Sequence, residues 1–176
     1  GRAYMLFAAP PEKDLEWSEQ GIEGCSRFLN RVFRVVDRHA DRLRAVQASN
    51  PHGAAVASLT DKERALLRKT HQTLKRVTDD FEIRWHFNTS VSAIMELVNE
   101  LYAREPLEQD ARPEIVKACL ERLVAMLAPL APHLAAELSE MLGRPGALEG
   151  EWPAFDSELA REDEYEIVVS AGGVPS

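Results

Sequence analysis

The chain has 176 residues, of which 45% are hydrophobic and 28% are charged. This length suffices for one domain with a substantial core, because a domain near 150 residues buries roughly 68–70% of the surface that its unfolded chain exposes. No apolar run approaches the roughly 20 residues that a membrane span needs, so no membrane association is expected. Cys25 and Cys119 form no Cys-x-x-Cys pair, which favours two free thiols in a reducing cytoplasm.

The net charge of −8 disfavours general nucleic-acid binding, but the charge is unevenly distributed. Residues 1–76 contain 14 Lys and Arg against 9 Asp and Glu, whereas residues 77–176 contain 7 against 20. The first part therefore carries +5 and the second −13. Any contact with a polyanion is predicted to fall on the first two helices of the chain.

The first predicted helix follows the Pro10-Pro11 pair, which interrupts the opening segment because proline lacks an amide donor. Ser18 can cap this helix, which is predicted to run to the loop that begins at Ser49. Its apolar positions are three, four or seven residues apart, as on a buried helix face: Ile22, Cys25, Leu29, Val32, Val36, Leu43 and Val46.

The later helices are predicted from caps, prolines and apolar periodicity. They are a second helix from the capping box Thr60-Asp61-Lys62-Glu63 to about Arg84, a third after Asn88 or Thr89 that ends at Glu105-Pro106, a fourth from Pro113 that Pro129 and Pro132 interrupt, and a short fifth from Leu134 to Leu142 that Gly143 ends.

After Gly143 the sequence predicts an irregular arm that Trp152 and Phe155 dock onto the helices, and one β-strand from Glu164 to Ser170. The predicted fold is therefore an all-α bundle of four to five helices with an irregular C-terminal arm and one short β-strand. The predicted limits are 1–17 for a connector, 18–143 for the helical domain, and 144–176 for the arm and the start of a following, truncated domain.

Five arginines share one face of the first predicted helix. Arg27, Arg31, Arg34, Arg38 and Arg42 are four, three, four and four residues apart. Guanidinium groups suit phosphate, and such binding would weaken with salt, log K falling by about 0.9 per phosphate neutralised on duplex-like targets. The alternative, which the pattern alone favours equally, is a solvated face where these arginines pair with acids of the same helix, namely Glu23, Asp37 and Asp41.

The sequence contains no recognisable active site. Glycine-rich phosphate loops, the Gly-x-Ser-x-Gly nucleophile motif and zinc-ligand spacings are absent. His86 and His133 are predicted to be packed, hydrogen-bonded structural residues. We therefore predict a binding or structural domain with no catalytic and no metal-binding residues, and a free-standing hydrolase or metalloenzyme is the weakest hypothesis.

Four stretches carry a family resemblance, in their order and spacing: Phe7 to Arg34, His86 to Thr89 with Ile94 to Leu101, Leu127 to Leu138, and Trp152-Pro153 with Glu166 to Val169. Over about residues 2–169, the chain resembles the helical anticodon-binding domain of class I, bacterial-type leucyl-tRNA synthetases. The third stretch is shared with valyl and isoleucyl synthetases, whereas the first is much more specific to the leucyl type.

The resemblance implies a cytoplasmic, monomeric parent enzyme that joins leucine to its tRNA with ATP and Mg²⁺. The family's His-x-Gly-His and Lys-Met-Ser-Lys-Ser motifs are absent, so the resemblance implies a catalytic domain outside this chain as one partner, reached through residues 1–17. The other implied partner is the leucine-accepting tRNA, away from the anticodon, which the family's leucyl members do not read. Arg27, Arg31 and Arg34 match the family's helix after the connector, and the resemblance places the tRNA contact there. The alternative function is a helical interaction module that docks another protein domain without binding RNA.

Overall fold

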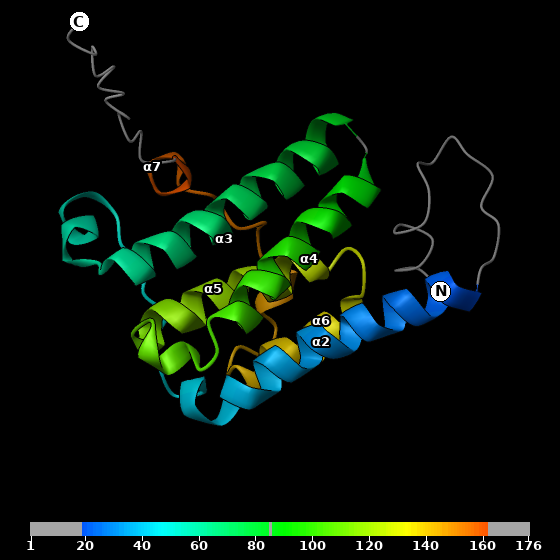
Figure 1. Cartoon of the computed structure of the whole chain (residues 1–176), viewed down its shortest axis with the longest axis horizontal. Coiled ribbons are helices and arrows are strands. Elements are labelled where there is room, and N and C mark those ends of the chain that lie inside the picture. Colours follow the sequence, from blue (N-terminus) through cyan, green and yellow to red (C-terminus); the bar gives the residue numbers. More distant parts are fainter. Residues whose placement is uncertain (1–18, 85, 162–176) are drawn as a thin grey trace, which may run out of the picture.

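The computed structural model describes residues 19–84 and 86–161, which form a bundle of helices (Figure 1). The helices are α2 (Glu19–Leu43), α3 (Asp61–Asp79), α4 (Phe87–Ala103), α5 (Pro113–Leu127), α6 (Pro132–Met141) and the short α7 (Ser157–Ala160). Three 3₁₀ turns, η1 (Gly53–Ser58), η3 (Leu107–Gln109) and η4 (Ala147–Glu149), and one π-helical turn, η2 (Asp80–Arg84), lie between them.

The predicted helical bundle is confirmed, and the described residues contain no β-strand. The predicted strand at 164–170 and the predicted connector at 1–17 lie outside the described residues. Figure 1 shows α2 along one edge of the bundle and α3 along the other, with α4 and α5 between them.

One face of α2 packs against α4, α5 and α6. The side chains on this face include Val32, Val35, Val36 and Leu43, none of which has any exposed surface. The prediction was wrong for Ile22, which is 42% exposed. Ile22 lies in the first turn of α2, which projects past the neighbouring helices (Figure 1). No described helix therefore covers its side chain, although its spacing is that of a buried position.

The C-terminal end of α2 lies at Leu43, several residues before the predicted end. The buried Lys117 of α5 donates from Nζ to the carbonyl oxygens of Leu43, Arg44 and Val46. These bonds supply donors to carbonyl groups at the end of the helix, where intrahelical partners run out, although the Leu43 carbonyl also accepts from the Val46 amide at 3.0 Å. Gly143 approaches the same place with a φ of +79°, and a Cβ there would lie 2.4 Å from the Arg44 carbonyl oxygen. Contacts from α5 and α6 thus set the end and the position of α2.

The predicted capping box at Thr60 is confirmed, and it also joins α3 to α5. The Glu63 amide donates to Thr60 Oγ1 at 3.2 Å, and the Thr60 amide donates to Glu63 Oε2 at 3.1 Å. The same carboxylate accepts from the Arg112 amide, Nε and Nη2 at 2.9, 2.8 and 3.0 Å. Glu63 is 1% exposed, so a buried carboxylate fixes the beginnings of two helices together.

The predicted cap of the third helix was wrong. Helix α4 begins at Phe87, with His86 at the N-cap position and no side-chain cap there. Thr89 and Ser90 instead donate their hydroxyl groups to the carboxylate of Asp80, which is 1% exposed. Because the buried Asp80 needs these donors, both residues lie inside the first turns of α4.

The arm after Gly143 docks on the bundle as predicted. Trp152 Nε1 donates to Thr78 Oγ1 at 2.8 Å, and its ring lies edge-on to that of Phe81 at 5.7 Å. Phe155 packs partly buried against the core. The amide of Asp156 donates to Nδ1 of the buried His71 at 2.9 Å.

The prediction for the histidines was wrong in its choice of residues. His86 and His133 are exposed, because both stand at the beginnings of helices at the surface. The packed, hydrogen-bonded histidines are His39 and His71, which are 3% and 2% exposed.

Candidate nucleic-acid interface

The five predicted arginines all lie on α2, on the side away from its buried face. From Arg27 to Arg42 they extend about 22 Å along the helix axis, at 1.5 Å per residue. Arg27, Arg34, Arg38 and Arg42 are exposed, and Arg31 is partly buried. We call this set the arginine row.

The C-terminal end of the arginine row is paired with acids of another segment. Arg38 Nη1 lies 3.2 Å from Glu105 Oε1, and Arg42 Nη1 lies 3.5 Å from Glu108 Oε2. Both glutamates belong to the connection between α4 and α5. His39 Nε2 lies 3.0 Å from the same oxygen of Glu105, so this carboxylate is held from the buried side as well.

The middle of the row rests on an aromatic ring. The Arg31 guanidinium carbon lies 4.7 Å from the centre of the Tyr102 ring, and that of Arg38 lies 5.8 Å from it. Tyr102 in turn donates its hydroxyl group to the Arg31 carbonyl oxygen at 3.0 Å. A guanidinium over a tyrosine ring is stabilised by the ring quadrupole and keeps its positive charge.

Arg27 and Arg34 form no ion pair and no ring contact within residues 19–84 and 86–161. The alternative in which acids of α2 neutralise the row was wrong. Over the same part of the chain, Glu23, Asp37 and Asp41 form no ion pair with any of the five arginines. Among the described residues, acids that are distant in sequence therefore neutralise the row at its C-terminal end only.

The basic residues of α3 differ from those of α2, because acids pair with all three of its lysines. Lys62, Lys69 and Lys75 pair with Asp110, Glu96 and Asp79 at 2.7, 3.1 and 2.9 Å. Arg64 donates to the carbonyl oxygen of Val56. Helix α3 is thus a weaker candidate for contact with a polyanion than the N-terminal half of α2.

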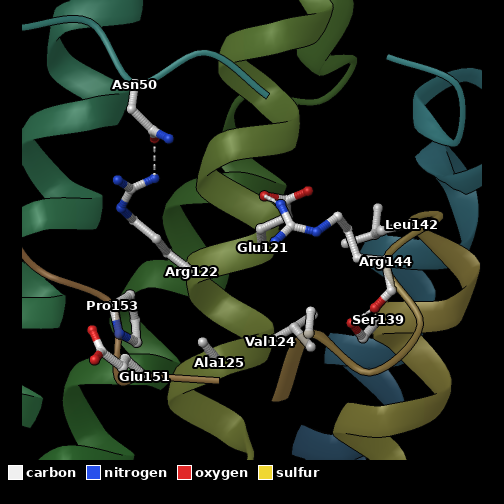
Figure 2. Close-up of a pocket in the computed structure, with 11 residues that line it drawn as sticks. Asn50, Glu121, Arg122, Val124, Ala125, Ser139, Leu142, Arg144, Glu151 and Pro153 are labelled. Carbon is white, nitrogen blue, oxygen red and sulfur yellow. Dashed lines mark hydrogen bonds and ion pairs between the residues drawn. The ribbon is translucent and has the colours of Figure 1, made fainter. Parts of the chain in front are cut away.

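A cavity of about 240 Å³ lies between α5, α6 and the arm (Figure 2). Arg122 points to Asn50 on one side, and Arg144 of the arm lies 3.3 Å from Glu121 of α5. Burial lowers the pKa of Arg122, and its Nη1 also donates to the carbonyl oxygen of Ala118. These charged groups hold the arm and the loop at Asn50 against α5.

The cavity offers no activated nucleophile. Its one hydroxyl side chain, Ser139, donates to the carbonyl oxygen of Arg144 at 2.6 Å and is not paired with a base. Within the described ranges, no group of three or more His, Cys, Asp or Glu could hold a metal ion. No described helix is long and apolar enough to cross a membrane.

The helical bundle matches a known domain family. The family model described as the anticodon-binding domain of tRNA ligase matches residues 63–173, so the chain belongs to this family of tRNA-ligase domains. The resemblance to leucyl-tRNA synthetases is confirmed by relatives. The chain is 46% identical to the leucine–tRNA ligase of Geotalea daltonii over 173 residues, and 44% identical to that of Syntrophus aciditrophicus over 176. Each alignment covers 98% of this chain and 20% of the relative, so the chain spans about a fifth of their length.

A solved structure has the same fold. It is the ternary complex of Agrobacterium radiobacter K84 agnB2 LeuRS with tRNA and LeuAMS, which is similar to this chain with a TM-score of 0.78 and 30% identity. The similarity covers 91% of this chain and 20% of that chain. The family match begins at Glu63, so the arginine row lies outside it but inside the regions covered by the relatives.

Sequence reasoning found the arginine row but missed Tyr102, Glu105 and Glu108. These residues meet α2 from more than 60 positions away along the chain. Of these three residues, the sequence marked only Glu105, as the residue before Pro106 at the predicted end of a helix. That position does not indicate which residue Glu105 contacts.

Proposed function

We propose that this chain is the tRNA-holding helical domain of a leucine–tRNA ligase. Leucylation, with its ATP and Mg²⁺, belongs in this proposal to a catalytic domain outside the chain, which residues 1–17 join to the bundle. Residues 144–176 form the arm and the start of a following domain. The parent is a cytoplasmic monomer. The relatives named leucine–tRNA ligase, which align with nearly the whole chain, support this proposal.

The arginine row is the proposed tRNA contact: Arg27, Arg31, Arg34, Arg38 and Arg42. The single observation that carries this is the state of Arg27 and Arg34, two exposed guanidinium groups with no acidic partner in the described part of the chain. They lie on a helix whose other face is buried from Cys25 to Leu43, so packing against the core holds the backbone beneath them in place. Unpaired guanidinium groups on a fixed scaffold can bind phosphates without first breaking an internal ion pair.

The charge distribution supports an orientation for the tRNA. The acidic second part of the chain would repel a polyanion, whereas the unpaired end of the arginine row would attract it. Arg31, stacked on Tyr102, is held in place and loses little freedom when a phosphate approaches. The tRNA backbone would then follow the exposed face of α2.

The test is the salt dependence of binding of a leucine-accepting tRNA transcript, measured by fluorescence anisotropy between about 50 and 200 mM KCl. Arg27→Gln/Arg34→Gln is expected to weaken binding at least tenfold. It should also reduce the slope of log K against log[salt] by about 1.4–1.8, for two phosphates. The matched control is Lys75→Gln/Arg76→Gln, which removes two exposed charges from α3 and should change both quantities much less.

Equal losses in the two double variants would remove α2 as the contact surface. If the chain binds no tRNA at any salt concentration but captures the catalytic part of a leucine–tRNA ligase in a pull-down, the interaction-module alternative replaces the proposal.

A further inference from the structure

We propose that Glu105 and Glu108 end the RNA contact on α2, so that tRNA phosphates meet Arg27, Arg31 and Arg34 but not Arg38 and Arg42. This inference rests on the proposed function and refines it. It assigns to two carboxylates the role of positioning the tRNA along the helix.

The two ends of the arginine row differ in net charge. At the C-terminal end, Arg38 and Arg42 lie 3.2 and 3.5 Å from Glu105 and Glu108, so two positive charges meet two negative ones. At the N-terminal end, none of the three arginines has an acidic partner among the described residues. A polyanion approaching α2 therefore meets three positive charges followed by a locally balanced segment.

The Glu105 carboxylate is anchored, whereas the Glu108 side chain is 44% exposed and is kept near Arg42 by its backbone position beside Leu107. Glu105 is hydrogen-bonded to His39, whose side chain is 4% exposed, and its own side chain is 14% exposed. Leu107, between the two glutamates, is completely buried. If phosphates displaced the carboxylates from Arg38 and Arg42, Glu105 and Glu108 would remain nearby and repel them.

The Arg38–Glu105 pair differs from an ordinary surface ion pair, which contributes little, because the Glu105 side chain is only 14% exposed. Neutralising an arginine removes one attraction for phosphate, and a fixed carboxylate beside it adds a repulsion of similar size. The C-terminal end of the row should consequently add little to tRNA affinity, although both of its arginines are exposed.

The test is a double-mutant cycle on tRNA binding, with the leucine-accepting transcript as probe. Glu105→Gln/Glu108→Gln is expected to tighten binding about fivefold per ion pair released at low salt. It should also steepen the salt slope by about 0.7–0.9 per additional phosphate. Glutamine at position 105 can still hydrogen-bond His39, and thermal unfolding should verify that the fold is retained.

The second arm of the cycle is Arg38→Gln/Arg42→Gln. It should change binding less than about twofold in the wild-type background, and fivefold or more in the Glu105→Gln/Glu108→Gln background. A larger effect in the second background would show that the carboxylates suppress the contribution of Arg38 and Arg42 to binding. A general structural effect of the arginine substitutions would be equal in both backgrounds.

The control for net charge is Asp79→Asn/Glu96→Gln, which frees Lys75 and Lys69 on α3 and raises the net charge by the same amount. An equal gain in this control would overturn the inference, as would a large loss for Arg38→Gln/Arg42→Gln in the wild-type background. The wild-type chain and Arg27→Gln/Arg34→Gln are measured in the same series. If that variant loses affinity but the glutamate variant gains none, the inference fails and the proposed function stands; if the wild type binds no tRNA, both fail.

Discussion

Replacing Glu63 by glutamine is expected to destabilise the bundle through the junction of α3 and α5. The carboxylate accepts four hydrogen bonds, two at each oxygen, from Thr60 and Arg112. Glutamine turns one of these oxygens into an NH₂ group, which then faces two donors. Two of the four bonds are lost, and the other two no longer involve a negative charge.

A hydrogen bond to a charged group contributes about 1.5–3 kcal/mol. The Arg112 side chain is half exposed, so solvent screening favours the lower end of this range. Two lost bonds thus predict a decrease of about 3 kcal/mol in the free energy of unfolding. For a chain of this length, that corresponds to a decrease in Tm of about 6–12 °C.

The assay is thermal unfolding followed by circular dichroism, with Glu114→Gln as the matched control. Glu114 lies 3.9 Å from Nε of the same arginine, but its side chain is 36% exposed. Its replacement should change stability by less than about 0.5 kcal/mol. If Glu63→Gln melts within about 2 °C of Glu114→Gln, the buried carboxylate does not hold the two helices together.

Three further predictions concern the parts that position α2 and the arm. Gly143→Ala should lower the free energy of unfolding in urea by at least about 2 kcal/mol, because the residue has a φ of +79° and a Cβ would lie 2.4 Å from a backbone oxygen. Lys117→Met should lower it by about 2–3 kcal/mol, because the carbonyl groups of Leu43, Arg44 and Val46 lose the hydrogen bonds from its ammonium group, and among the described residues only that of Leu43 keeps a second bond, from the Val46 amide. Burial and the nearby Arg122 guanidinium lower the pKa of His71 from 6.5 to about 4, so the unfolded chain binds a proton at higher pH than the folded one. Stability should therefore fall as the pH falls from 6.5 to 4, and His71→Asn, which keeps an acceptor for the Asp156 amide, should reduce this fall by about 3 kcal/mol in urea unfolding at the two pH values.

Local signals in the sequence were sufficient to predict which segments are helical. Three such signals affect only the residues next to them, and the structure has each in its predicted role: the capping box at Thr60, Pro113 at the beginning of α5, and Gly143 with its positive φ. Where the ends of helices depend on distant groups, local reasoning failed. Lys117 binds the backbone where α2 ends earlier than predicted, and Thr89, in the first turn of α4, donates to the buried Asp80 carboxylate.

For the candidate interface too, the sequence predicted the local features but not the contacts between distant residues. The spacing of the arginines along one helix was readable, because it depends only on helical geometry. Which of them are neutralised was not readable, because Glu105 and Glu108 reach α2 through the tertiary fold. The sequence offered Glu23, Asp37 and Asp41 as partners on proximity alone, and none of them pairs with the row in the described residues.

The path of the tRNA over α2 can be measured directly by site-specific crosslinking. The native cysteines suit this experiment: Cys25 and Cys119 are both buried, and burial raises the pKa of both thiols, that of Cys119 to about 11, so neither is readily alkylated. A photoreactive label would be attached at Asn30→Cys, an exposed position three residues after Arg27 and four before Arg34. The control is Ser92→Cys, exposed on α4 one turn before Glu96, which faces α3.

We expect the label at position 30 to crosslink to a leucine-accepting tRNA transcript, and added salt and Arg27→Gln/Arg34→Gln both to suppress the crosslink. The label at position 92 should give little product. Equal crosslinking from both positions, or crosslinking from position 92 alone, would contradict the claim that tRNA lies along the exposed face of α2.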